Sequence, residues 1–180
     1  MTSEEKDTLV QGLRSDNDVE VLAALNRLEL LLRSNEGDDV YLAPLSFLLR
    51  STDIEIRRKA SWCIGKLAQN KAIHEAPMDQ LNKLLTDEDD EVTVNAAWAI
   101  GELAGRGVGG EGSIEPLNVL LQMGSVEKRC MAAWALGRLA VNLYAVHPSS
   151  MRILERMAVG DDDPNVRKAA GWALQQVPMS

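Results

Sequence analysis

Aromatic residues and cysteines are scarce in this sequence. Of its 180 residues only 4% are aromatic, with one Phe and two Tyr. β-Sandwiches and barrels draw on aromatic and β-branched residues for their strands, so an all-β fold is disfavoured. The two cysteines, Cys63 and Cys130, are too few for a disulfide framework and indicate a reducing, cytoplasmic compartment.

Long apolar runs and excess positive charge are also lacking. No apolar run approaches the roughly 20 residues that span a bilayer. The acidic N-terminus, MTSEEKDTLV, does not have the charged-then-apolar order of a signal peptide. The formal charge is −8, whereas nucleic-acid-binding surfaces are basic. The composition therefore predicts a protein that acts on neither membranes nor nucleic acid.

Motifs that signal catalysis are missing as well. His74 and His147 are the only histidines, and neither has a second ligand at metal-binding spacing, so we expect no metal and no cofactor. The pattern Gly-x-Gly-x-x-Gly occurs at 107–112, but it joins two helical units rather than a strand and a helix. We interpret it as a flexible turn that could act as a hinge between units. Cys130, beside Arg129, is the one candidate for a reactive thiol.

One segment recurs along the chain every 36 residues. It reads KASWCIGKLA at 59–68, NAAWAIGELA at 95–104 and MAAWALGRLA at 131–140, and AAGWALQQV follows at 169–177. A Leu-rich element repeats in the same register, at 43–51, 79–87 and 115–123. The segments 6–15 and 19–32 form a weaker first copy, and 151–160 supplies the first element of the last copy, so the total is about five units of two elements each. We predict a single domain with approximate repeats at 1–36, 37–72, 73–108, 109–146 and 147–180.

Each element has the period of a helix. In 56–67 the apolar residues form one stripe, which consists of Ile56, Ala60, Cys63, Ile64 and Leu67. Acidic links precede the second helices and place Asp53, Asp89 and Asp163 at their N-cap positions. A helix pair of this length cannot bury its own apolar face, so the pairs must stack. The predicted fold is all-α: a right-handed α-α superhelix of about five helix pairs, with the second helices lining its concave side.

On these motifs the chain resembles the HEAT and armadillo repeat superfamily over essentially its whole length. The closest pattern is that of short HEAT-like repeats of the phycobilin-lyase type, an acidic turn followed by Val-Arg and Ala-Ala-x-Ala-Leu-Gly. Here it reads NVRKAAGWAL at 165–174 and EIRRKASWCIG at 55–65. Such repeats carry an Asp–Arg ladder along the solenoid. Arg57, Arg129 and Arg167 share its phase, and Thr93 interrupts the series.

All four tryptophans occupy one position of the second helix, outside the apolar stripe. At about 100° per residue, Trp62 lies near 240° from Ile56. In the resembled repeats this side faces a concave groove where partners dock. In the 36-residue register the stripe consists of Arg58, Lys59, Trp62, Lys66, Val94, Asn95, Trp98, Glu102, Cys130, Met131, Trp134, Arg138, Lys168, Ala169, Trp172 and Gln176. Two interpretations remain open: the indoles pack in the seam between second helices, or they form an aromatic ladder open to the groove.

The charges of the stripe suggest the kind of ligand. Five of its residues are basic (Arg58, Lys59, Lys66, Arg138 and Lys168), and only Glu102 is acidic. A locally basic, Trp-lined groove favours an acidic or amphipathic peptide or helix. We therefore expect a non-enzymatic scaffold that binds a protein partner.

Two resemblances bear on this expectation. AAWALGRLA also resembles the armadillo repeats of nuclear-import adaptors, in which each groove Trp is followed four residues later by Asn. Here those positions hold Lys66, Glu102, Arg138 and Gln176, so basic import signals are disfavoured as ligands. The alternative function is that of an enzyme or enzyme subunit, like the HEAT-like bilin lyases and DNA glycosylases.

Overall fold

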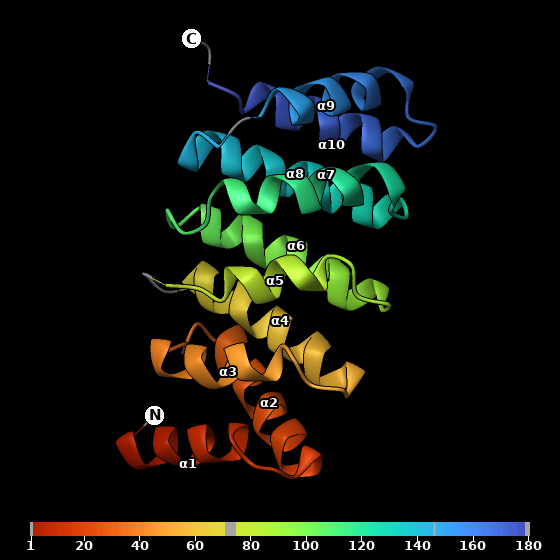
Figure 1. Ribbon diagram of the computed structural model, residues 1–180. Coiled ribbons are helices and arrows are strands. Elements are labelled where there is room, and N and C mark those ends of the chain that lie inside the picture. Colours follow the sequence, from red (N-terminus) through yellow and green to blue (C-terminus); the bar gives the residue numbers. More distant parts are fainter. Residues whose placement is uncertain (1, 71–74, 146, 179–180) are drawn as a thin grey trace.

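The computed structural model describes residues 2–70, 75–145 and 147–178, and in these ranges it is helical without strands. The α-helices follow one another as pairs (Figure 1). The pairs are α1 (Ser3–Leu13) with α2 (Asp18–Arg33), α3 (Leu42–Leu48) with α4 (Ile54–Asn70), α5 (Met78–Leu84) with α6 (Asp90–Ala104), α7 (Ile114–Met123) with α8 (Val126–Leu143), and α9 (Pro148–Gly160) with α10 (Pro164–Gln175). The prediction of an all-α solenoid is confirmed. Each pair lies within one predicted repeat, and the repeat boundaries themselves stay a prediction.

The helices form two layers. Figure 1 shows the first helices α3, α5, α7 and α9 across the near side of the stack, with the second helices behind them. Each second helix packs directly on the next, from α2 through α4, α6 and α8 to α10. We call each of these contacts a joint. The surface of the second helices that points away from the core is called the second-helix face below.

The core is a continuous band of Leu, Ile and Ala side chains between the two layers. The predicted apolar stripe is part of it: Ile56, Ala60, Cys63, Ile64 and Leu67 are each no more than 1% exposed. Burial of apolar surface stabilises by roughly 25 cal/mol per Å². Because one cluster runs from Leu9 to Ala173, neighbouring units stabilise one another.

The acidic links cap the second helices, as predicted. Asp53 and Asp89 each accept a hydrogen bond from the backbone N–H three residues later, at 3.1 and 3.0 Å. Asp163 accepts one from the N–H two residues later, at 2.8 Å, and Pro164 occupies the first turn of α10. These bonds satisfy N–H groups that a helix leaves free at its start. Capping therefore accounts for one acid in each of these three links.

Arginines connect successive units along the edge where these links lie, as the resemblance implied. Arg57 donates through Nε and Nη2 to the two carboxylate oxygens of Asp87, at 2.8 and 3.0 Å. Arg129 donates through Nη2 to Asp161 Oδ1 at 2.9 Å. Thr93 bonds instead to two backbone carbonyls of its own link, at 3.3 and 3.0 Å. The ladder is therefore interrupted at the joint between α6 and α8.

The glycine-rich segment 107–112 is a turn between units, as predicted. Gly107 and Gly109 have φ angles of 75° and 127°, in the left-handed region that favours glycine. The segment leads into the 3-10 helix Glu111–Ser113 and then into α7. A second 3-10 helix, Asp39–Tyr41, precedes α3.

Candidate partner-binding face

The predicted stripe lies on the second-helix face. Of its sixteen residues, fifteen are half-buried and Lys168 is exposed. None belongs to the fully buried core. The helical period therefore separated the core side of each second helix from this side correctly.

Three of the four tryptophans pack on a glycine of the preceding second helix. A Cβ atom placed on Gly65 would lie 2.5 Å from Cε3 and Cζ3 of Trp98. The same contact recurs at the next two joints, with nearest distances of 2.1 Å for Gly101 with Trp134 and 2.6 Å for Gly137 with Trp172. Only a residue without Cβ leaves room for the ring. These indoles therefore fill the seams between second helices.

The indoles also present an open edge. Cε3 and Cζ3, which contact glycine, lie on the side of the indole opposite Nε1. Within the described ranges no acceptor pairs with an indole Nε1, and none of the four is a buried atom without a partner. The N–H groups therefore reach solvent. The two interpretations of the sequence are compatible, because a ring can fill the seam and still expose its polar edge.

Trp62, the first of the series, has a charged neighbour instead of a glycine. The Arg33 guanidinium carbon lies 5.0 Å from the centre of the Trp62 ring. Arg33 in turn pairs with Glu29 of α2, at 2.6 Å. The Trp62 and Trp98 ring centres are 6.4 Å apart, and their planes are tilted by 34°. The cation lies over the ring and is attracted to its π-face, so Arg33 partly covers the N-terminal end of the tryptophan series.

Two basic residues of the stripe are paired with acids that the stripe does not include. Arg58 donates through Nε and Nη2 to the two oxygens of Asp89, at 2.9 and 2.5 Å. Lys59 donates to Glu29 at 3.1 Å. Arg58, Lys59 and Glu29 line a cavity of about 150 Å³ between α2, α4 and α6. Acids from the neighbouring helix and link therefore balance the charges of Arg58 and Lys59. Lys66, by contrast, donates to Gln69 Oε1 at 2.5 Å and has no carboxylate partner among the described residues.

This pairing shifts the pKa values of the acids. The hydrogen bond from Arg58 lowers the pKa of Asp89 to about 2. Burial raises the pKa of Glu29, but hydrogen bonds from Arg33 and Lys59 outweigh it and lower the pKa overall. Both carboxylates are therefore ionised at neutral pH, and the ion pairs persist there.

The C-terminal half of the stripe combines cations with apolar surface. The Arg138 guanidinium carbon lies 5.6 Å from the centre of the Trp134 ring, and Nε donates to the Gly101 carbonyl at 3.2 Å. Lys168 projects from the start of α10. In the described part of the chain no carboxylate pairs with either cation. Met131 packs against the core from the same face. This half keeps the positive charge that the sequence predicted.

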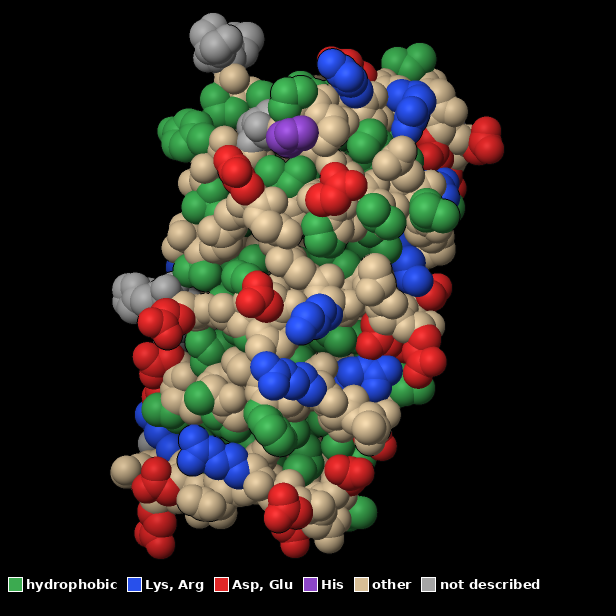
Figure 2. Space-filling view, in the orientation of Figure 1, with side chains coloured by type: hydrophobic (Ala, Val, Ile, Leu, Met, Phe, Trp, Pro, Cys, Tyr) green, Lys and Arg blue, Asp and Glu red, His purple; other side chains and the backbone are tan. Residues whose placement is uncertain are grey.

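The opposite side of the molecule has a different distribution of charged side chains. Figure 2 shows the side of the first helices, where acidic and basic side chains are interspersed without a broad patch of either sign. A cavity of about 530 Å³ lies on this layer between α3 and the start of α5.

Neither cysteine is an activated thiol. Burial raises the pKa of Cys130 and of Cys63, so both are protonated at neutral pH. No three His, Cys, Asp or Glu residues within the described ranges are placed to hold a metal ion; His74 lies outside those ranges. None of the described helices has the length and apolarity of a membrane span.

Sequence reasoning missed Glu29 and Arg33, and it predicted Asp89 only as an N-cap and not as the partner of Arg58. The first repeat has no tryptophan, so its second helix was not included in the stripe. The residue spacing offered one signal. Gly65, on which Trp98 packs, precedes that tryptophan by 33 residues. The residue 33 positions before Trp62 is Glu29, which indicates that α2 lies next to Trp62.

Two family models match the chain. Residues 22–123 match the model described as non-SMC mitotic condensation complex subunit 1. Residues 127–177 match the model of a HEAT-like repeat. No curated protein matches the chain.

Several solved structures are similar. A designed armadillo repeat protein in complex with the peptide (KR)4 has a TM-score of 0.73 and 25% identity, over 94% of this chain and 80% of that one. A computationally designed armadillo repeat protein for modular peptide recognition has a TM-score of 0.65 and 22% identity, over 94% and 81%. The complex of CpcE and CpcF of phycocyanin lyase from Nostoc sp. PCC7120 has a TM-score of 0.72 and 16% identity, over 97% and 65%. The last two similarities concern the fold alone.

Proposed function

The chain belongs to the family described as non-SMC mitotic condensation complex subunit 1, within the HEAT/armadillo class of solenoids, and on this premise we propose that it is a non-enzymatic module that binds a partner protein. The family is described as a subunit of a complex, which suits a protein that works by binding others. We place the binding site on the second-helix face. A rigid stack of helices holds that face in shape before a partner arrives, which reduces the entropic cost of docking.

The observation that carries the proposal is the series of half-buried indoles with free N–H groups. Trp98, Trp134 and Trp172 are held on glycines, so they lose little freedom when a ligand covers them. Tryptophan contributes strongly to binding because it combines a large contact area with a directed donor. A partner lying along α6, α8 and α10 would meet one such donor at each helix.

The partner that fits this face is an acidic, amphipathic peptide or helix. Arg138 and Lys168 supply cations that no acid of the described chain neutralises. Met131 and the edges of Trp134 and Trp172 supply apolar area beside them. Apolar contacts give affinity, and complementary charge gives specificity and faster association. Nucleic acid does not fit, because the positive charge is local and the chain as a whole carries −8.

The test uses a synthetic amphipathic peptide of Leu and Glu and the same peptide with Lys in place of Glu. All four tryptophans lie on the proposed site, so their fluorescence reports binding there directly. We expect the Glu peptide to change the emission saturably. Replacing Arg138→Glu together with Lys168→Glu should weaken its binding at least tenfold, about 1.4 kcal/mol.

The matched control reverses two exposed cations of the first-helix layer, Arg50→Glu and Lys83→Glu. It makes the same change in net charge but should leave binding unchanged. Equal binding of the Lys peptide, or equal loss in the control, would contradict the proposal.

A further inference from the structure

Arg167, the last arginine of the ladder, is anchored like Arg57. In Arg57, Nη1 donates to the backbone carbonyls six and five residues earlier, at 2.9 and 3.2 Å. In Arg167, Nη1 donates to the carbonyls at the same two positions, at 2.6 and 3.1 Å. The two guanidinium groups are therefore oriented alike relative to their helices.

Among the residues that the structure describes, the other side-chain donors of Arg167 have no partner. In Arg57, Nε and Nη2 bind the two oxygens of Asp87 in the next unit, and in Arg129, Nη2 binds Asp161. No acceptor in the described part of the chain lies against Nε or Nη2 of Arg167. Because the anchor is the same, these donors point along the solenoid to the place of a carboxylate in a following unit.

The outer side of α10 resembles the side of a second helix at an internal joint. Nothing lies within 4 Å of a Cβ placed on Gly171, whereas Ala97 and Ala133, at its position in α6 and α8, are fully buried. Leu174 is half-buried, whereas its counterpart Leu136 is 4% exposed. These small and apolar residues suit contact with another helix.

The first unit carries a link of matching geometry. The Asn17 N–H donates to Ser15 Oγ at 3.1 Å, as the Asp89 N–H donates to Asp87 Oδ1 at 3.0 Å. Ser15 therefore holds the place of the ladder acid, and Asp16 follows it.

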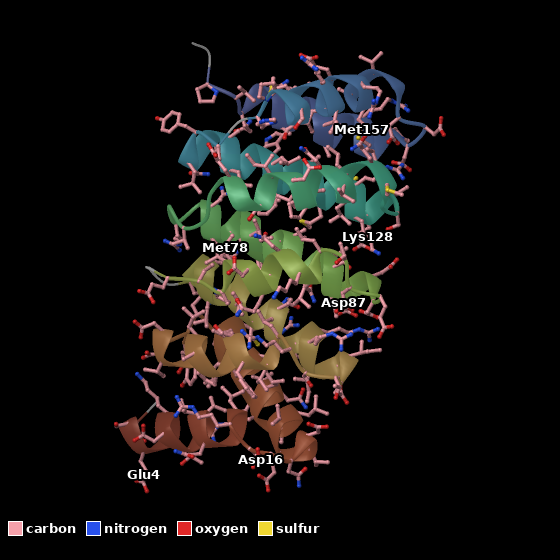
Figure 3. All side chains as sticks on the ribbon, in the orientation of Figure 1. Glu4, Asp16, Met78, Asp87, Lys128 and Met157 are labelled. Atoms are coloured by element: carbon pink, nitrogen blue, oxygen red, sulfur yellow. The ribbon has the colours of Figure 1, made fainter. Side chains whose placement is uncertain are left out.

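Asp16 is positioned to supply the missing carboxylate. Its counterpart in the third unit, Glu88, brings Oε1 to 3.7 Å from Arg57 Nη2. Asp16 is exposed, and Figure 3 shows Glu4 and Asp16 extending from the N-terminal end of the stack. Apolar surface accompanies them on α2, where Val19 and Leu30 are 75% and 68% exposed.

The two ends of the solenoid also differ in charge. Figure 2 shows mainly acidic side chains along the N-terminal end, whereas Lys or Arg side chains lie among acidic ones at the C-terminal end of the same side. Arg152 and Arg156 of α9 are exposed, but so are Glu155 and Asp162, so the C-terminal end carries both signs while the N-terminal end is mainly acidic.

We propose that copies of this chain associate head to tail, with α1–α2 of one copy stacked on α9–α10 of another and Asp16 of the first paired with Arg167 of the second. The contact reproduces an internal joint between two molecules. A head-to-tail contact leaves both outer ends free, so further copies can add as the concentration rises. The proposal is independent of ligand binding on the second-helix face.

Sedimentation velocity of the full chain over a range of concentrations tests it. The mean mass should rise with concentration and fall when NaCl is added, because salt screens the pair. Arg167→Asp and Asp16→Arg should each weaken self-association at least tenfold. Mixing the two variants should restore association, because each mixed contact again joins opposite charges. Recovery on mixing also shows that both variants are folded.

The control is Lys83→Asp, an exposed cation away from both ends, which should associate like the unchanged chain. A chain that stays monomeric at all concentrations overturns the proposal. So does association that is unaffected by Arg167→Asp, or a mixture that remains monomeric. Peptide binding measured by tryptophan fluorescence should be the same in every one of these variants, so the outcome is separate from that of the proposed function.

Discussion

At the scale of single residues, the glycines of the second helices are explained by the tryptophans of the next unit. Glycine inside a helix costs about 1 kcal/mol relative to alanine. Gly65, Gly101 and Gly137 nevertheless interrupt the Ala- and Leu-rich helices α4, α6 and α8. Each one provides the space that an indole occupies. The glycine and the tryptophan are therefore two halves of one contact.

The packing of tryptophan on glycine predicts that replacing glycine with alanine changes stability in opposite directions at Gly101 and at Gly171. Gly101→Ala should destabilise by about 1–3 kcal/mol, because its Cβ would lie 2.1 Å from Trp134 Cζ3 and overpacking outweighs helix propensity. Gly171→Ala should stabilise by about 0.5–1 kcal/mol, because its Cβ meets nothing within 4 Å. Urea denaturation measures both. If both variants are stabilised, Trp134 does not rest on Gly101.

The residue scale also shows how far sequence reasoning reaches. The position of the tryptophans outside the core could be predicted, because helical phase depends only on residues of one helix. The neutralisation of Arg58 and Lys59 could not, because Asp89 and Glu29 are 31 and 30 residues away on other elements. A helical wheel contains only the residues of one helix, so it does not show charged residues on neighbouring elements that pair with them.

At the scale of elements, the joints between second helices are not equivalent. At the joint of α4 with α6, Arg57 and Arg58 both pair with acids of the following link. At the joint of α6 with α8, Thr93 replaces the ladder arginine and Met123 stands where the acid would be. Lys128 and Asp90 supply a different link there, at 2.6 Å; Figure 3 shows Lys128 and Asp87 on the same edge of the stack.

Restoring the missing ladder pair is the prediction at this scale. Thr93→Arg alone should destabilise, because Thr93 is 1% exposed and the arginine would lack a carboxylate. Met123→Asp alone should be nearly neutral, since Met123 is 84% exposed. Together they should recover at least about 1 kcal/mol beyond the sum of the single effects. Additive changes in the free energy of unfolding would show that no pair forms.

The elements themselves were predictable to different degrees. The second helices followed from the apolar period, which every copy repeats, and three of their N-caps followed from the acidic links; the link before α8 has no acid, and Ser125 caps that helix. The 3-10 helix Asp39–Tyr41 was not foreseen, because three residues carry no periodic signal. Its Tyr41 is fully buried beneath α3, so tertiary packing rather than local propensity determines that segment.

At the scale of the whole molecule, stacking divides the surface into regions that differ in charge and in side-chain composition. The first helices carry mixed charge, the second helices carry the indoles, and the two ends carry unequal charge. Since each unit packs on its neighbours, the second-helix face extends along the whole stack. That geometry favours an elongated partner.

The central claim is that a partner binds across the indoles of the second-helix face. The most direct test is a ¹H–¹⁵N spectrum of the chain, in which the four indole N–H groups give separate signals, recorded during titration with the Leu–Glu peptide. We predict that the signals of Trp98, Trp134 and Trp172 move together and saturate. The Trp62 signal should move least, because Arg33 covers that ring. Binding that moves backbone signals of the first helices and leaves all four indoles unchanged would contradict the account.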